Sequence, residues 1–132
     1  MNSKLTVGLT GEARYRVVTQ HLVSAVNPAG PAVLASPWLL SFLEHAAYNA
    51  LAPHLEKGQQ SVGVGFDFEH LAPTPAGHVV IARARVTAVE GPRVTLDIEA
   101  HDEAEPIARG THVRAVIDMH RFERRRQRKA RE

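Results

Sequence analysis

The chain has 132 residues, of which 44% are hydrophobic and 23% charged, as in one globular domain and unlike a disordered segment. It has no cysteine, which excludes disulfides, thiolate nucleophiles and Cys-based metal centres. No apolar run approaches the roughly 18 residues of a membrane span, and residues 1–16 lack the apolar core of a secretory signal. We therefore expect a cytoplasmic protein with no membrane partner.

The positive charge is confined to the end of the chain. Residues 121–132 carry seven Arg or Lys against two Glu, whereas residues 1–120 carry nine basic and twelve acidic residues. A nucleic-acid interaction would rest on the terminal run alone, which more simply forms a solvated helix end or a frayed tail. We expect a domain over residues 1–120 and a basic tail over 121–132 that is a weak candidate for binding an anion.

The first half of the chain predicts one strand and one long helix. Residues 12–20 favour a strand, and the Asn, Gly and Pro residues at 27–31 predict a loop. Ser36 followed by Pro37 is typical of a helix start, with the hydroxyl as the N-cap. We expect this helix to run to about Leu55 and to be buried, because apolar residues occupy much of its circumference.

Four consecutive strands are expected after the helix. They are predicted over residues 61–70, 78–89, 93–102 and 105–119. In the first of them, one face is expected to hold Val62, Val64, Phe66, Phe68 and His70. A three-residue loop at 90–92 would keep the apolar residues of the next two strands on one face. Their outer face would then pair Arg83 with Glu99 and Arg85 with Asp97.

The last strand alternates apolar and polar residues. Val113, Ala115 and Ile117 are expected to share the apolar face, which leaves Arg114 out of phase with them. Arg114 is then most simply a surface cation, with pairing to a carboxylate or a phosphate as the alternative. One strand, one buried helix and four antiparallel strands make an α+β layout in which a curved sheet wraps a central helix, the hot-dog arrangement.

Glu44 is the residue that the helix pattern explains least. Its neighbours along the same helix face include Leu40 and Leu51, so we expect a desolvated carboxylate, which is typical of acid–base or nucleophilic chemistry. The alternative is a structural pairing with an Arg or His at a helix or subunit boundary. His70 is expected on the face that packs on the helix, near Glu44, where a hydrogen-bonded core histidine is the alternative to catalysis.

Other residues have simple structural explanations. Gly63 lies on a side-chain-poor face of its strand, which either admits a ligand or another backbone, or marks a bend. Ser36 lies where the helix dipole favours negative charge on a ligand. The sequence has none of the spacings typical of zinc, dinucleotide or triphosphate sites, so no metal and no cofactor are expected.

Several stretches of the chain together resemble one family. They are PxxxAS at 31–36, FLEHAAYNALAPHLEKGQQSVGVGFDFEHLAPTPAG at 42–77, VEGPRVTLDIEAHDEAEPIARGTH at 89–112 and RAVI at 114–117. These stretches are similar to the hot-dog thioesterases of the fluoroacetyl-CoA thioesterase type. The resemblance covers about residues 12–123.

This resemblance implies a catalytic set made of a hydroxyl at the helix start, a helical glutamate and a strand histidine. These positions fall on Ser36, Glu44 and His70. The family has threonine where this chain has Ser36, which keeps the hydroxyl. The resemblance also implies that the backbone N–H of Gly63 faces the developing oxyanion and that Arg114 lies near the ligand.

One departure from the family bears on the substrate. The family's best-known member has a phenylalanine in the loop before the helix that closes over the fluoroacetyl group, and that position is Gly30 in this chain. Glycine forms no aromatic gate, so we expect a broader or different short acyl group. The resemblance also implies a homodimer or higher homo-oligomer with sheets joined edge to edge. In it, Ser36 and Glu44 of one subunit would meet Gly63 and His70 of the other.

The function that the resemblance implies is hydrolysis of a short or small acyl-CoA thioester to the free acid and CoA. Glu44 would act as nucleophile or as general base for water. The CoA group belongs to the substrate, and its phosphates would meet Arg114, Arg109 or the tail. The alternative from another class is a non-catalytic acyl-CoA-binding module on the same fold, and a nucleic-acid partner ranks below both.

Overall fold

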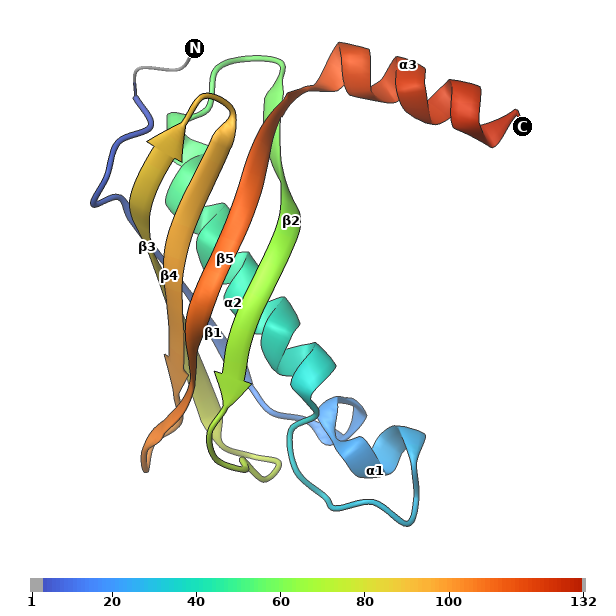
Figure 1. Cartoon of the computed structure of the whole chain (residues 1–132). Helices are drawn as coiled ribbons and strands as arrows, with labels where there is room; N and C mark the ends of the chain where they lie inside the picture. The colour runs from blue at the N-terminus through green and yellow to red at the C-terminus, as the bar shows by residue number, and fades with distance from the viewer. Residues whose placement is uncertain (1–3, 132) are drawn as a thin grey trace.

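The computed structural model describes residues 4–131, in which a five-stranded antiparallel sheet curls around one long helix (Figure 1). The elements are β1 (Thr10–Arg16), η1 (Thr19–His21), α1 (Val23–Val26), α2 (Ser36–Leu51), η2 (Ala52–His54), β2 (Gln59–His70), β3 (Val79–Glu90), β4 (Arg93–His101), β5 (Pro106–Asp118) and α3 (Met119–Ala130). The strand order is β1-β3-β4-β5-β2, so β1 and β2 are the edges. The predicted α+β layout is confirmed.

The central helix α2 is buried as predicted. Its buried face consists of Leu39, Phe42, Leu43, Ala46, Ala47, Ala50 and Leu51. The small residues let β1 approach closely, since a Cβ on Gly11 would clash with the carbonyl oxygen of Ala46. The α-helix ends at Leu51 and not near Leu55, and a 3₁₀ turn continues from it. Pro53 follows two residues later and has no N–H to extend the helical hydrogen bonds.

Ser36 is the first residue of α2 and not its N-cap. The cap is Ala35, whose carbonyl oxygen accepts the backbone N–H groups of Trp38 and Leu39. The Ser36 hydroxyl is instead hydrogen-bonded to a histidine outside the helix. The sequence expectation of a capping role is therefore wrong, because the hydroxyl has a different partner.

The pairing between β3 and β4 confirms the predicted charge pairs, although the loop and the regularity of the strands differ from the prediction. Arg83 lies opposite Glu99 and Arg85 opposite Asp97. The hairpin loop, however, has two residues and not three, because Glu90 pairs with Arg93. A shift in register between Val86 and Ala88 adds the residue that restores the apolar faces of both strands to one side.

A second irregularity changes which side chains of β2 face the helix. The register of β2 against β5 shifts between Gly63 and Gly65. The side chains that face the helix are therefore odd-numbered before the shift (Ser61) and even-numbered after it (Phe66, Phe68 and His70). Val64 is 52% exposed, and the expectation that it shares a face with Phe66 is wrong. A bulge inserts one residue and reverses the alternation beyond it.

The inner face of β5 also differs from the expectation. His112 and Arg114 are buried, at 0% and 4% exposure, and point to the same side of the strand. The interpretation of Arg114 as a surface cation is therefore wrong. The alternative, in which it pairs with a carboxylate, is what the structure shows.

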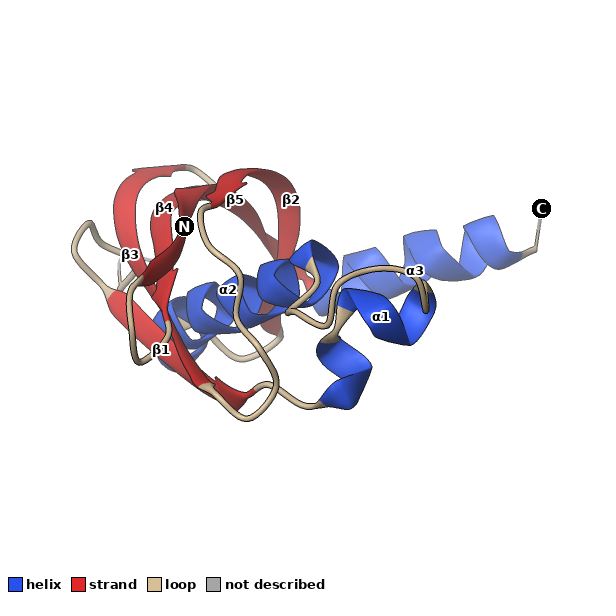
Figure 2. Cartoon of the chain, turned by 90° about the horizontal axis from the view of Figure 1, so that it is seen from below, coloured by secondary structure: helices blue, strands red, loops and turns tan. Residues whose placement is uncertain are grey.

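The basic segment at the end of the chain forms α3, which extends away from the sheet on the β2 side (Figures 1 and 2). The Asp118 side chain caps this helix by accepting the backbone N–H of Arg121 at 3.0 Å, and α3 has no buried residue. Within residues 4–131, no helix combines the length and hydropathy needed to cross a membrane.

Candidate active site

The first polar pair of the site lies at the start of α2. The Ser36 hydroxyl and Nδ1 of His70, at the end of β2, are 2.8 Å apart. Burial lowers the pKa of the His70 imidazole, and the neighbouring Ala72 carbonyl acts in the opposite direction. Nε2 of His70 is a buried atom with no hydrogen-bond partner among the described residues. Such an atom is costly unless a ligand or another chain supplies a partner.

The second polar group lies farther along α2, where Glu44 faces the bulged part of β2. Its Oε2 is 3.3 Å from Nη1 of Arg114. A Cβ added to Gly63 would lie 2.6 Å from the same oxygen, so the carboxylate rests directly against the glycine backbone. The Glu44 side chain is 43% exposed, and the expectation that it is desolvated within the chain is wrong.

Arg114 is held on several sides. Its Nε donates to the Ser61 hydroxyl at 2.9 Å and its Nη2 to the Ser61 carbonyl at 2.9 Å. Burial lowers the pKa of the Arg114 guanidinium, and the Glu44 carboxylate opposes that shift. Arginine stays charged in proteins, so a fixed cation lies beside the carboxylate.

His112 belongs to this group and sequence reasoning did not select it. Its Nδ1 lies 2.8 Å from the Gly65 carbonyl oxygen and its Nε2 lies 3.1 Å from Nη1 of Arg114. The available signal was parity, because His112 and Arg114 are two residues apart on one strand and must share a face.

The two groups are separate within one chain. Ser36 and Glu44 are eight residues apart on α2, which is about 12 Å along a helix axis. The sequence resemblance implies that Ser36 and Glu44 of one subunit meet Gly63 and His70 of the other. The structure instead joins Ser36 to His70, and Glu44 to Gly63, within the same chain.

Gly30 lies in the loop between α1 and α2. Its N–H donates to the Asn27 carbonyl oxygen at 2.8 Å. A Cβ at this position would lie 2.9 Å from the Val23 side chain. The nearest neighbours of Gly30 are therefore in α1 and in its own loop, and its effect on the acyl group stays a prediction.

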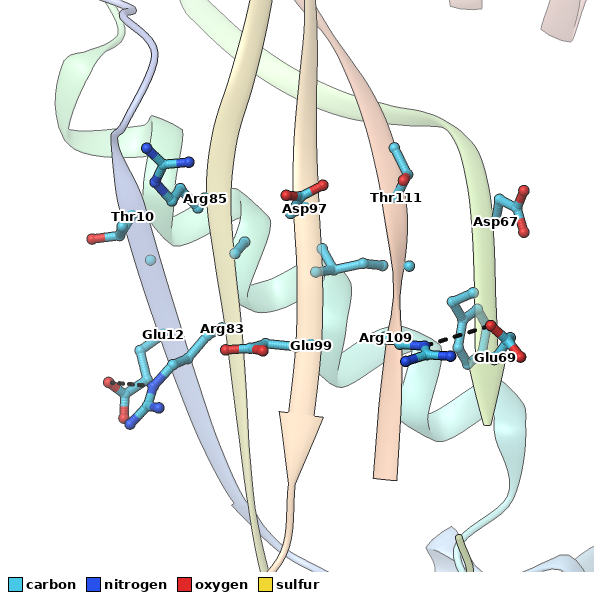
Figure 3. Close-up of a pocket in the computed structure, with 15 residues that line it drawn as sticks. Thr10, Glu12, Asp67, Glu69, Arg83, Arg85, Asp97, Glu99, Arg109 and Thr111 are labelled. Atoms are coloured by element: carbon cyan, nitrogen blue, oxygen red, sulfur yellow. Dashed lines mark ion pairs between the residues drawn. The ribbon is translucent and has the colours of Figure 1, made fainter. Parts of the chain in front are cut away.

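A large hollow on the outer face of the sheet does not contain the candidate catalytic residues. Figure 3 shows it lined by side chains of alternating charge from all five strands. Four of the lining residues form two ion pairs, between Arg83 and Glu12 at 3.9 Å and between Arg109 and Glu69 at 3.6 Å. Arg109 thus faces away from Glu44, and these charges form cross-strand pairs typical of a solvated sheet face.

The contact between Gly63 and Glu44 predicts a sensitive position. Replacing Gly63 with alanine should move the carboxylate and lower kcat by about 10- to 100-fold, since misplacement by about 1 Å has effects of that size. The folding midpoint should change little, because the closest contact is with the half-exposed end of Glu44, and the next, with Cε1 of His112 at 3.2 Å, needs only a small shift.

The matched control for this substitution is Gly65→Ala. Its Cβ would meet only the Val113 side chain, at 4.0 Å, which is an ordinary contact. Steady-state hydrolysis of an acyl-CoA by both variants measures the difference. Equal kcat values for the two would contradict the importance of the Gly63 contact.

The curled sheet around a single helix, with polar groups between α2 and β2, defines the hot-dog class of fold. A solved hot-dog-like protein from Thermanaerovibrio acidaminovorans matches 97% of this chain and 95% of its own at 28% identity, with a TM-score of 0.88. The model of the fluoroacetyl-CoA-specific thioesterase family matches residues 17–120. The chain belongs to this family of thioester hydrolases.

Two further relatives agree with this assignment. The chain is 39% identical over 92 residues to the fluoroacetyl-CoA thioesterase of Streptantibioticus cattleyicolor, a match that spans 70% of this chain and 66% of that enzyme, just under two thirds of its length. A crystal structure of the fluoroacetyl-CoA thioesterase FlK superposes with a TM-score of 0.87 at 32% identity and covers 95% of this chain and 97% of its own. The resemblance predicted from the sequence is confirmed.

Proposed function

We propose that this protein is a cytoplasmic acyl-CoA thioesterase that hydrolyses a short or small acyl-CoA thioester to the free acid and CoA. The observation that carries the proposal is the pair of polar groups on α2 in a chain of this family. One group is Ser36 hydrogen-bonded to His70, and the other is Glu44 against Gly63. A carboxylate can act as nucleophile or general base in thioester hydrolysis, and an imidazole with a hydroxyl beside it can transfer the protons.

Glu44 has two possible routes in this proposal. It attacks the thioester carbonyl, giving a mixed anhydride and releasing the CoA thiolate, and water then cleaves the anhydride. Alternatively it takes a proton from a water molecule that attacks the same carbonyl. In both routes His70 transfers a proton and Ser36 orients the imidazole. The lack of a partner for Nε2 among the described residues supports this role of His70. The backbone N–H of Gly63 would stabilise the oxyanion.

The separation of the two groups suggests a site completed by a second chain. β2 is an edge strand and carries two exposed apolar residues, Val64 and Phe66. A two-fold axis between two such edges makes them antiparallel. The His70 end of one β2 then lies beside the Gln59 end of the other. This arrangement brings Ser36 and His70 of one chain toward Glu44 and Gly63 of its partner.

The acyl group is proposed to be small but not restricted to fluoroacetyl. Gly30 has no side chain to close over the substrate, which favours a broader or different short acyl group. Buried Arg114, beside Glu44, would lie near the thioester. Arg109 lies on the outer face with Glu69, so the phosphates of CoA would take their cations from the tail.

Removal of residues 123–132 tests that role of the tail. We expect the KM for an acyl-CoA to rise several-fold, because α3 supplies exposed arginines for the phosphates. The KM for the same acyl group on pantetheine, which lacks those phosphates, should stay unchanged. The folding midpoint should also stay unchanged, since α3 has no buried residue. An unaltered KM for the acyl-CoA would exclude a major contribution from α3.

The experiment that tests the function is thiol release from acyl-CoAs of increasing size. The panel runs from acetyl and fluoroacetyl through butyryl and benzoyl to palmitoyl. Turnover of one small member at an enzyme-like rate supports the thioesterase, and the profile identifies the acyl group that Gly30 admits. Folded protein that binds these esters without releasing thiol would support the alternative, an acyl-CoA-binding module.

A further inference from the structure

His112 is a fully buried histidine that the mechanism above does not use. It lies on the inner face of β5 with 0% exposure. Its ring stacks on Phe66 with centroids 3.9 Å apart and an interplanar angle of 11°. Its Cε1 atom lies 3.2 Å from where a Cβ on Gly63 would be. The ring is therefore held in one orientation by the same bulged strand that contacts Glu44.

The two ring nitrogens of His112 have different partners. The partner of Nδ1 is the Gly65 carbonyl oxygen at 2.8 Å, which can only accept, so Nδ1 carries the proton and donates. The partner of Nε2 is Nη1 of Arg114 at 3.1 Å, which can only donate, so Nε2 accepts. The neutral imidazole protonated at Nδ1 is the one state that satisfies both contacts.

The surroundings of the ring favour this neutral state. Burial is the main cause that lowers the pKa of His112, and the charge of Arg114 acts in the same direction. The Gly65 carbonyl and the Glu44 carboxylate oppose the shift but do not reverse it. A proton on Nε2 would also point at the guanidinium.

The contact with Nε2 determines where Arg114 points. Nη1 of arginine has two N–H groups, and in this site it lies near two acceptors, Nε2 of His112 and Oε2 of Glu44 at 3.3 Å. Ser61 holds the other side of the guanidinium through Nε and Nη2. When His112 takes one N–H of Nη1, the second N–H is left for the carboxylate.

We propose that His112 is a positioning residue of the thioesterase site, a neutral acceptor that fixes Arg114 so that Nη1 holds Oε2 of Glu44 against Gly63. This inference rests on the proposed function of Glu44. It adds to that function a residue that does not touch the substrate and acts through Arg114. The carboxylate is then restrained at one oxygen while its other oxygen stays available to the reaction.

Two substitutions separate this role from simple packing. His112→Gln places an amide oxygen near the position of Nε2 and retains an acceptor for Arg114, whereas His112→Asn retains a donor for Gly65 and lacks that acceptor. Both remove the ring and its stacking on Phe66. We expect the Asn variant to lose kcat by about 10- to 100-fold with KM within about twofold. The Gln variant should keep kcat within about fivefold of the original enzyme.

Thermal unfolding of both variants shows whether they are equally folded. If the Asn variant does not fold, His112→Leu, which also lacks the acceptor, is compared with Arg114→Ala, alone and combined, as the second test. Under the proposal, adding the Leu substitution to Arg114→Ala has no further effect on kcat, because His112 acts only through Arg114. An equal kcat loss in the Asn and Gln variants, or additive losses in the combined variant, would overturn the proposal.

A measurement without substrate distinguishes failure of this proposal from failure of the proposed function. Long-range ¹H–¹⁵N NMR of the labelled protein at neutral pH should show a protonated Nδ1 and an unprotonated Nε2 for His112. A doubly protonated ring, or one protonated at Nε2, would overturn the proposal even in an active enzyme. A protein with the expected tautomer that releases no thiol from any acyl-CoA would count against the thioesterase function instead.

Discussion

Replacing Glu44 with glutamine is expected to lower kcat for acyl-CoA hydrolysis by at least about 10³-fold, within the range that removal of a general base or nucleophile produces. Glutamine keeps the shape of the side chain but neither attacks a thioester nor accepts a proton from water. The side chain is 43% exposed, so the substitution should not unfold the protein. Thiol release under saturating substrate measures the loss.

The control for this prediction is a second exposed carboxylate of similar size outside the site. Glu69 on the outer sheet face pairs with Arg109 at 3.6 Å, and Glu69→Gln should leave kcat unchanged. Equal folding midpoints for the two variants would assign the loss to chemistry. Activity retained by Glu44→Gln would remove Glu44 from the mechanism and favour a route centred on Ser36 and His70.

The fold was predictable because its main signals are local. The apolar circumference of α2 required a buried helix, and alternation in the later strands placed four of them in sequence. The register of β3 against β4 was predicted by placing the apolar residues of both strands on one face, and the resulting pairing of Arg85 with Asp97 is confirmed. Each of these inferences uses neighbours within a few residues along the chain or across one hairpin.

The site was harder to predict because a bulge in β2 breaks that alternation. One extra residue at the register shift between Gly63 and Gly65 brings Gly63 to the face of α2. Valine is a common residue in regular strands, so the residue type of Val64 does not predict a register shift at this position. The same difficulty affected Arg114, whose burial depends on Ser61 and Glu44, residues 53 and 70 positions away in sequence. Such contacts follow from the tertiary fold and not from the local pattern.

Ser36 shows a different case, in which the sequence selects a candidate residue but predicts an incorrect local role for it. A hydroxyl before Pro37 satisfies the usual pattern of a helix cap, yet Ala35 caps α2 through its backbone. The hydroxyl is 2.8 Å from Nδ1 of His70, 34 residues away. Ser36 lies one position past the cap, and the partner of its hydroxyl is a candidate catalytic residue.

A mixture of two inactive variants is expected to recover activity if the site is shared between chains. Glu44→Gln keeps Ser36 and His70, and His70→Ala keeps Glu44 and Gly63. In mixed dimers of these variants, one of the two composite sites is complete. Random assembly in equal amounts makes half of the dimers mixed, so about a quarter of all sites should be active. After co-expression with two affinity tags, the doubly purified dimers are all mixed, so thiol release from them should correspond to about half of the sites being active.

The matched control is Glu44→Gln co-expressed with the double variant Glu44→Gln/His70→Ala. No dimer of this mixture has a complete site, whether the site lies within one chain or is shared between two chains. If Ser36, His70 and Glu44 of one chain act together, neither mixture recovers, because every chain lacks one of the three. That outcome would require α2 or β2 to move by about the 12 Å that eight residues span on a helix. Recovery in the first mixture alone would instead explain why the buried Nε2 of His70 has no partner within the described chain.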